Sequence, residues 1–208
     1  MSFRPAPRRT RPVGAGPHDD AVTQALAAVP RRDFLPASVR SRADDDVALP
    51  LGYGQTGSQP TTVAAMLRLL EVGPGQHVLD VGSGSGWTTA LLAHLVGPTG
   101  EVLGLELVPE LVVLGRDHLE ARRAPWARIE PADPDRLGRA RPGGWDRILV
   151  SASPRRLPGA LVRQLAPSGR LVVPVRTTMV LVTVGDDGRA LVSEHGAYSF
   201  VPLHGPLD

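Results

Sequence analysis

The stretch HVLDVGSGSGWTTALLAHLVG, residues 77–97, decides the fold of this chain. Its first five residues are mostly apolar and rich in valine, which is typical of a short buried strand. Gly82, Gly84 and Gly86 follow in a turn, and an apolar helix begins near Trp87. Glycines in such a turn let a ligand approach the backbone, and the first N–H groups of the helix stay free to bind it. The stretch therefore predicts a strand, a turn and a helix that form a ligand site.

The segments that follow repeat the alternation of strand and helix. We expect strands over residues 77–82, 101–107, 127–133, 146–153, 170–176, 179–186 and 189–203, and helices over residues 87–97, 109–123 and 158–169. This order predicts an α/β fold of the Rossmann-like class, with a doubly wound, mostly parallel sheet and helices on both faces. The run of strands at the end, joined by a GDDG hairpin turn, predicts antiparallel strands at the C-terminal edge of the sheet.

The region ahead of the first strand divides into an arm and a cap. Residues 1–18 are rich in Pro, Gly and Arg and predict a disordered arm. From residue 19 to residue 208 we expect one domain, whose first part, residues 19–73, forms a cap of helices and loops. Within this cap the patterns indicate a helix over residues 19–30, a short helix or turn over residues 31–40, a loop over residues 49–60 and an amphipathic helix over residues 59–72.

Composition excludes several kinds of site. The 208 residues contain no cysteine, so disulfides, thiolate nucleophiles and cysteine-bound metals are excluded, and all 23 basic Lys and Arg residues are arginine. No two of the six histidines stand at ligand spacing, so we predict no metal. The sequence has no apolar run long enough to span a membrane and no secretory signal at its start. We therefore expect a cytoplasmic monomer without a membrane partner.

Two acidic residues indicate which ligand the glycine turn binds. Asp80 ends the strand ahead of the glycines, where a carboxylate would repel a pyrophosphate but suits an ammonium group. Glu106 ends the next strand, where an acidic side chain accepts both hydroxyls of a ribose. Together they favour S-adenosylmethionine, a cation with a ribose and no phosphate, over a dinucleotide. The predicted cofactor site comprises these two residues and the turn residues Gly82, Ser83, Gly84, Ser85 and Gly86.

A third acidic residue follows the third strand of the alternating series. Asp133 lies at the edge of the sheet where ligands bind in this topology. We expect it to accept a hydrogen bond from the adenine amino group of the cofactor. An Asx-turn in a proline-rich loop is the alternative interpretation.

Four segments resemble the protein-L-isoaspartate (D-aspartate) O-methyltransferase family. The segment ALPLGYGQTGSQPTTVAAML (residues 48–67) is similar to that family's PLPIGxGQTISQPxxVAxM, and residues 77–97 resemble its cofactor motif. The blocks GGWDRILVSASPRRLPGALVRQLAPSGRLVVPV (residues 143–175) and YSFVPLHG (residues 198–205) resemble its fourth-strand block and its closing VxFVPLxG. Together they cover about residues 21–206, in the family's order. The resemblance implies methyl transfer from S-adenosylmethionine to the α-carboxylate of L-isoaspartyl residues in damaged proteins or peptides, which starts repair through a succinimide.

The resemblance also implies which residues act on the substrate. In the family, the loop that matches residues 49–60 folds over the cofactor and presents a hydroxyl to the substrate carboxylate, which here would be Ser58, with Thr56 beside it. A neutral hydroxyl suits this task, because a carboxylate is already a nucleophile at pH 7 and needs orientation rather than a base. Capping of the helix that begins near Pro60 is the alternative role for both hydroxyls.

The chain departs from the family pattern around the expected substrate groove. Gly57 replaces a bulky aliphatic residue, Asp44 an aromatic one and Arg176 a glycine, and the usual GDG after the third strand reads PADPDRLG. A second hypothesis is therefore a dedicated peptide aspartate carboxyl O-methyltransferase in natural-product biosynthesis, and a third is a sensor or adaptor that binds the cofactor without transferring its methyl group. Nucleic-acid methylation is not expected, because the chain lacks both an (N/D)PP(Y/F) site and a cysteine.

Overall fold

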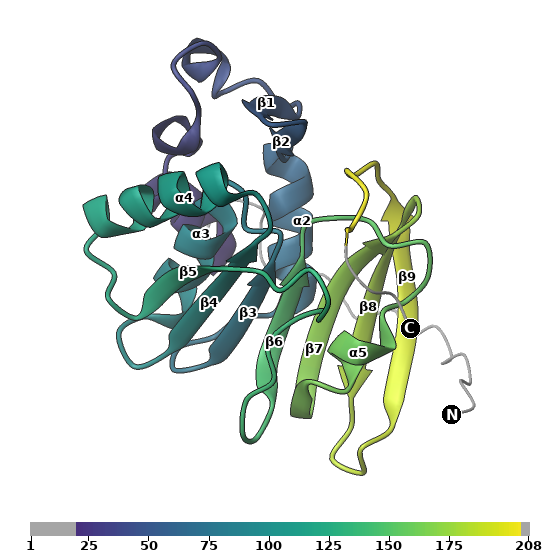
Figure 1. The fold of residues 1–208 in the computed structure, drawn as a ribbon. Coiled ribbons are helices and arrows are strands. Elements are labelled where there is room, and N and C mark those ends of the chain that lie inside the picture. Colours follow the sequence, from purple (N-terminus) through teal and green to yellow (C-terminus); the bar gives the residue numbers. More distant parts are fainter. Residues whose placement is uncertain (1–19, 205–208) are drawn as a thin grey trace.

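A computed structural model describes residues 20–204 and contains a central sheet of seven strands in the order β5–β4–β3–β6–β7–β8–β9 (Figure 1). The strands are β3 (His77–Val81), β4 (Glu101–Glu106), β5 (Ala127–Pro131), β6 (Trp145–Val150), β7 (Leu165–Val175), β8 (Thr178–Val184) and β9 (Ala190–Ala197). Strands β3 to β7 run parallel, and β8 and β9 are antiparallel to their neighbours. The predicted doubly wound, mostly parallel sheet with antiparallel C-terminal edge strands is confirmed.

The strand order reverses between β3 and β6, which are neighbours in the centre of the sheet. After β3 the chain adds strands on one side of the sheet, and from β6 onward it adds them on the other. The loops that leave the carboxyl ends of these two strands therefore diverge and open a crevice. Gly82 follows β3 and Ser151 follows β6, so both residues lie at this crevice.

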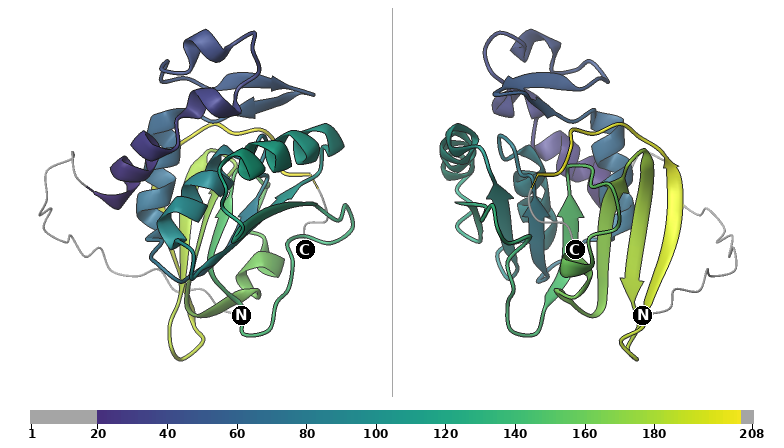
Figure 2. Two further views of the ribbon diagram at one scale, coloured as in Figure 1. Left: turned by 90° about the vertical axis from the view of Figure 1, so that its left-hand side faces the viewer. Right: turned by 45° about the vertical axis from the view of Figure 1, so that its right-hand side comes forward.

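Helices cover the two faces of the sheet unequally (Figure 2). The helices α1 (Ala21–Ala28), α2 (Pro60–Leu70), α3 (Trp87–Val96) and α4 (Pro109–Ala121) all contribute to one apolar cluster with the sheet. Leu137, Trp145 and the one-turn helix α5 (Gly159–Val162) belong to the cluster on the opposite face. The predicted helices on both faces are present, but the four longer ones share one side.

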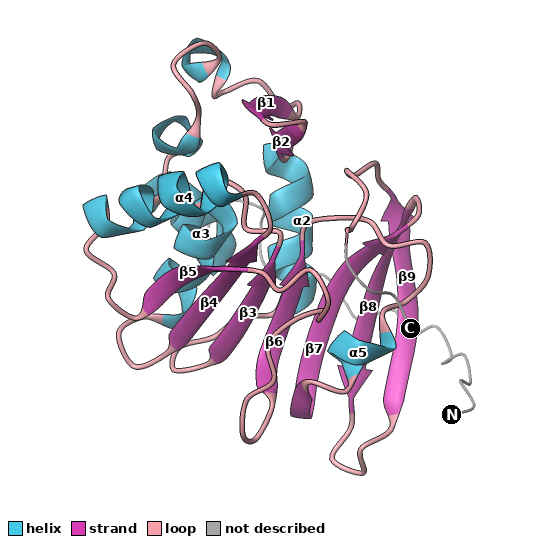
Figure 3. Cartoon of the chain, viewed as in Figure 1, coloured by secondary structure: helices cyan, strands magenta, loops and turns pink. Residues whose placement is uncertain are grey.

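The expected loop over residues 49–60 is wrong, because this segment forms a β-hairpin above the carboxyl ends of the parallel strands (Figure 3). It consists of β1 (Leu49–Gly52) and β2 (Gln55–Gly57) and follows two short 3₁₀ helices, η1 (Arg31–Phe34) and η2 (Arg40–Arg42). Tyr53 and Gly54 both have positive φ angles, of 55° and 73°, as a tight hairpin turn requires. Leu49 and Leu51 are buried against Leu35 and Leu111, so one face of the hairpin is apolar.

The expected helix over residues 158–169 is shorter than the sequence pattern predicts. Only α5 is helical, and β7 already begins at Leu165, which pairs with Trp145 before the register shifts. Pro167, Ser168 and Gly169 lie within β7 and do not fit a helix, because proline lacks an N–H donor and Ser168 has a φ of 58°. They are accommodated as an irregularity within a long strand.

The expected strand over residues 189–203 is also shorter, since β9 ends at Ala197. The chain then crosses the carboxyl ends of the central strands. The Tyr198 N–H donates to the Thr177 carbonyl at 2.8 Å, and the Ser153 N–H donates to the Val201 carbonyl at 2.8 Å. This crossing segment, residues 198–203, brings the end of the described chain over the crevice.

None of the helices in residues 20–204 is both long enough and apolar enough to cross a membrane. The predicted disordered arm, residues 1–18, lies outside the described residues.

Candidate active site

A cavity of about 360 Å³ lies between the hairpin and the carboxyl ends of β3, β4 and β5. Eight of the residues predicted to bind cofactor or substrate line it: Thr56, Ser58, Gly82, Ser83, Gly84, Ser85, Glu106 and Asp133. We call it the cofactor cavity. Asp80 and Gly86 do not line this cavity. The structure therefore brings together most, but not all, of the residues predicted to form the site.

The glycine turn has the backbone geometry that its sequence predicts. Gly82, Gly84 and Gly86 have positive φ angles of 78°, 56° and 91°, a region that other residues adopt at a cost. At Gly86 an added Cβ would lie 3.1 Å from Ile129 Cδ1 and 3.2 Å from the Gly115 carbonyl oxygen. Gly86 therefore lets α3 pack closely against α4 and β5 instead of facing the ligand.

Glu106 is buried in the wall of the cofactor cavity with its carboxylate held by backbone donors. Its Oε2 accepts from the Gly84 N–H at 2.8 Å, and its Oε1 accepts from the N–H groups of Leu107 and Val108 at 2.8 and 3.0 Å. A carboxylate has about four acceptor positions, so one stays available for a ligand hydroxyl. The same contact fixes the glycine turn against the end of β4.

Asp80 lies behind the cavity wall and is fully buried. Its Oδ2 accepts hydrogen bonds of 2.7 Å from the hydroxyls of both Thr88 and Thr89, whereas its Oδ1 has no partner within the described chain. Burial raises the pKa of this carboxyl to about 6, against an ordinary value of 3.8. Thr88 lines the cavity, so it connects Asp80 to any ligand there. The direct contact between Asp80 and the cofactor stays a prediction.

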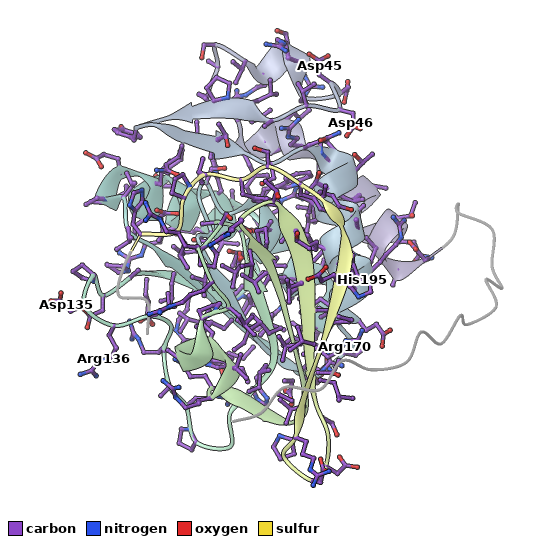
Figure 4. All side chains as sticks on the ribbon, turned by 90° about the vertical axis from the view of Figure 1, so that its right-hand side faces the viewer. Asp45, Asp46, Asp135, Arg136, Arg170 and His195 are labelled. Carbon is purple, nitrogen blue, oxygen red and sulfur yellow. The ribbon has the colours of Figure 1, made fainter. Side chains whose placement is uncertain are left out.

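Asp133 has features of both interpretations made from the sequence. Its Oδ1 accepts from the Asp135 N–H at 2.9 Å, which is an Asx-turn. The residue also lines the cofactor cavity and is exposed to solvent. Asp135, by contrast, does not line the cavity and projects outward from this loop (Figure 4).

A second hollow, of about 700 Å³, adjoins the cofactor cavity, and we call it the acceptor cavity. Thr56, Ser58, Ser151 and Val201 line both cavities, and we call these four residues the partition. Four further residues that carry a hydroxyl, Thr61, Thr62, Tyr198 and Ser199, line the acceptor cavity alone. The two cavities therefore share the part of their walls that the partition forms.

Arg31 holds the segment that carries Ser58. Its side chain is only 6% exposed, and its Nη2 donates to the carbonyls of Val47 at 2.8 Å and Gly57 at 3.0 Å. Its guanidinium carbon lies 5.6 Å from the centre of the Trp87 ring, and Trp87 also lines the cofactor cavity. Burial lowers the pKa of this arginine, and Asp46 and Asp45 counteract that effect.

Asp46 holds the same segment from the other side of Ser58. Its carboxylate accepts from the Thr61 N–H at 3.0 Å, from the Thr61 hydroxyl at 2.8 Å and from Gln59 Nε2 at 3.0 Å. These hydrogen bonds, the backbone one first, lower the pKa of Asp46. It thereby supplies a side-chain cap to the start of α2, which the capping residue Gln59 itself does not. Figure 4 places Asp46 beside the hairpin, above the sheet.

Sequence reasoning missed three residues of this site. Arg31 acts through backbone carbonyls that are distant in sequence, which leave no local pattern. Thr88 stands inside an apolar helix, where a hydroxyl is usually a core residue. Ser151 directly follows β6 at the point where the strand order reverses, and no sequence pattern assigned it a role.

Comparison of the sequence with known proteins matches this chain to one family of methyltransferases. The family described as Protein-L-isoaspartate(D-aspartate) O-methyltransferase (PCMT) matches residues 14–207. A protein-L-isoaspartate O-methyltransferase 1 of Anaeromyxobacter sp. is 42% identical over 203 residues, covering 94% of each chain. A protein-L-isoaspartate O-methyltransferase of Aeropyrum pernix is 40% identical over 188 residues, covering 88% of this chain and 72% of the relative.

Two solved structures share the fold. A putative protein-L-isoaspartate O-methyltransferase from Plasmodium falciparum, in complex with S-adenosyl-L-homocysteine, has a TM-score of 0.74 and 27% identity, covering 89% of this chain and 90% of that chain. A protein-L-isoaspartate O-methyltransferase structure has a TM-score of 0.81 at 23% identity and covers 91% of this chain, which spans only 62% of that longer one. Because the family match extends over nearly the whole sequence, the chain belongs to the protein-L-isoaspartate (D-aspartate) O-methyltransferase family.

Proposed function

We propose that this chain transfers a methyl group from S-adenosylmethionine to the α-carboxylate of L-isoaspartyl residues in damaged proteins or peptides. As a member of its family, it is an S-adenosylmethionine-dependent carboxyl methyltransferase. The methyl ester then collapses to a succinimide, which reopens in part as ordinary aspartate and so repairs the chain. The observation that supports the proposal is the partition, where the cavity lined by most of the predicted cofactor residues adjoins a second cavity.

The residues of the cofactor cavity fit S-adenosylmethionine. Glu106 keeps an acceptor position for a ribose hydroxyl, and the turn Gly82–Ser85 supplies backbone that a ligand can approach. The buried hydroxyl of Ser83, a residue that lines this cavity, has no hydrogen-bond partner, which supports a polar ligand whose contact completes the site. When bound there, S-adenosylmethionine supplies an electrophilic methyl group on a sulfonium. Asp133 is the residue we assign to the adenine.

The acceptor needs orientation rather than activation. An isoaspartyl α-carboxylate is ionised at pH 7, so no base has to remove a proton. In our proposal Ser58 donates a hydrogen bond to one carboxylate oxygen and leaves the other free to attack, with Thr56 beside it on the partition. The hairpin that carries Thr56 thereby places the acceptor beside the methyl group, and this positioning lowers the entropic cost of the transfer.

The test uses two peptides of identical sequence, one with aspartate and one with isoaspartate at a single position. Each is incubated with the enzyme and methyl-labelled S-adenosylmethionine, and base-labile methyl ester is counted. We expect transfer to the isoaspartyl peptide alone. Transfer to neither peptide by a protein that still binds S-adenosylhomocysteine would contradict the repair function. It would favour instead a carboxyl methyltransferase dedicated to one peptide.

A further inference from the structure

Ser151 is fixed by the sheet at the point where the strand order reverses. Its N–H donates to the Val81 carbonyl at 2.9 Å, which continues the pairing of β6 with β3. An added Cβ at Gly82 would lie 3.9 Å from the Ser151 Cβ, so the residue packs against the start of the glycine turn. A side chain placed by paired strands is held more precisely than one placed by a loop.

The hydroxyl of Ser151 is available to a ligand. It belongs to the partition together with Ser58, and within residues 20–204 no hydrogen bond occupies either hydroxyl. Ser153, two residues further on, differs in this respect, because its hydroxyl donates to the Arg176 carbonyl at 2.8 Å. Each free hydroxyl can donate one hydrogen bond. Two donors, one next to the hairpin and one next to the sheet, therefore lie in the wall that the two cavities share.

The wall of the acceptor cavity, as far as the chain is described, contains no charged side chain. Glu106, Asp133 and Arg136 line the cofactor cavity only, and Asp46 contacts the acceptor wall through Gln59 and Thr61. A carboxylate that enters this space meets hydroxyl donors instead of a cation. Hydrogen bonds to a carboxylate are stronger than neutral ones, so two of them suffice to fix its plane.

We propose that Ser151 is a second residue that orients the acceptor carboxylate, acting from the end of β6 while Ser58 acts from the hairpin. This proposal rests on the proposed function. In the transfer, one carboxylate oxygen forms a bond to the methyl carbon, the carbon–sulfur bond breaks, and its electron pair stays on sulfur. No proton moves, so both serines act only as hydrogen-bond donors.

The decisive variant is Ser151→Ala in the full chain. We expect kcat/KM for the isoaspartyl peptide to fall roughly ten- to hundredfold, the effect of losing one hydrogen bond to a charged acceptor. The Kd for S-adenosylhomocysteine, measured by calorimetry, should stay within about twofold, because Ser151 does not carry the cofactor. Ser151→Thr keeps the hydroxyl and should retain most of the activity. Ser153→Ala is the matched control, and its kcat/KM should equal that of the wild type.

A second measurement tests the absence of a cation from the acceptor site. A peptide in which a carboxamide replaces the isoaspartyl α-carboxylate is titrated into the enzyme with S-adenosylhomocysteine present. A hydroxyl both donates and accepts, but its hydrogen bonds to a neutral amide are weaker than those to a carboxylate, so we expect this peptide to bind more weakly than the isoaspartyl peptide by no more than about thirtyfold. A larger loss would show that a positive charge binds the carboxylate and would overturn recognition by hydroxyls alone.

The outcomes separate this proposal from the one on which it rests. If the wild type methylates the isoaspartyl peptide and Ser151→Ala retains full kcat/KM, the role of Ser151 is overturned and the proposed function stands. If the wild type methylates neither peptide, the proposed function fails and this proposal fails with it. A fall in kcat/KM with an equal fall in cofactor affinity would assign Ser151 to the cofactor and would also overturn the proposal.

Discussion

The guanidinium of Arg31 donates a hydrogen bond of 3.0 Å to the carbonyl of Gly57, the residue that precedes Ser58. The same side chain binds the carbonyls of Asp45 and Val47 and lies over the Trp87 ring. One buried arginine thus connects the 3₁₀ helices, the hairpin and the first residue of α3. The position of Ser58 depends on a contact across the cap.

Arg31→Lys should reduce both stability and activity. A lysine ammonium has three donors and no planar fork, so it leaves some of the buried carbonyls without a partner. We expect the free energy of unfolding to fall by about 2–4 kcal/mol, measured by urea denaturation. Arg32→Lys, at an exposed neighbour, is the control. Equal stability of the two variants would show that Arg31 does not hold the hairpin.

Asp46→Asn should lower turnover without changing cofactor affinity. The amide keeps one acceptor oxygen but turns an NH₂ group toward donors on Thr61 or Gln59. The segment after Ser58 then loosens, and we expect kcat to fall roughly three- to tenfold. The Kd for S-adenosylhomocysteine is measured on the same sample. Asp45→Asn is the control, because the Asp45 side chain forms an exposed ion pair with Arg42 and no hydrogen bond to the segment after Ser58, so kcat should change much less than in Asp46→Asn.

Asp80 should make stability fall as pH rises through mildly acidic values. Burial raises its pKa to about 6 in the folded state, from 3.8. Between about pH 4 and pH 6 the native state therefore holds a proton that the unfolded state has lost, so the free energy of unfolding decreases with pH. The decrease is on the order of 3 kcal/mol. Asp80→Asn removes this titration, and parallel pH profiles for the two proteins would contradict the assignment.

Gly86→Ala should destabilise the protein more than Gly188→Ala does. Both glycines have positive φ angles, of 91° and 74°, so both substitutions carry the backbone cost. Only at Gly86 would the new Cβ meet Ile129 and Gly115, at 3.1 and 3.2 Å, whereas nothing lies within 4 Å of it at Gly188. We expect an additional loss of about 1–3 kcal/mol at Gly86, measured by thermal denaturation. Equal losses would show that α3 and α4 are not closely packed there.

The parts of the fold that sequence predicts well are those fixed by local pattern. The strand, turn and helix of residues 77–97 were predicted because apolar periodicity and three glycines lie within one short segment. The burial of Val63, Met66, Leu67 and Leu70 in α2 follows from helical spacing in the same way.

The features that sequence missed depend on distant partners. The glycines and hydroxyls of residues 49–60 resemble a loop, and they form a hairpin because Leu49 and Leu51 pack against Leu35 and Leu111. Asp80 was predicted to bind the cofactor, but the hydrogen bonds that its Oδ2 accepts from the hydroxyls of Thr88 and Thr89 were not predicted. The contacts of a side chain at the end of a strand depend on residues that are close in space. The sequence alone does not show which residues these are.

The central claim is that Ser58 orients the acceptor at the partition while the cofactor is held by other residues. The most direct measurement compares Ser58→Ala with the wild type, using methyl ester formation on the isoaspartyl peptide and calorimetric binding of S-adenosylhomocysteine. We predict that kcat falls roughly ten- to hundredfold while the Kd for S-adenosylhomocysteine stays within about twofold. An unchanged kcat, or a loss of cofactor affinity that accounts for the whole effect, would contradict the account.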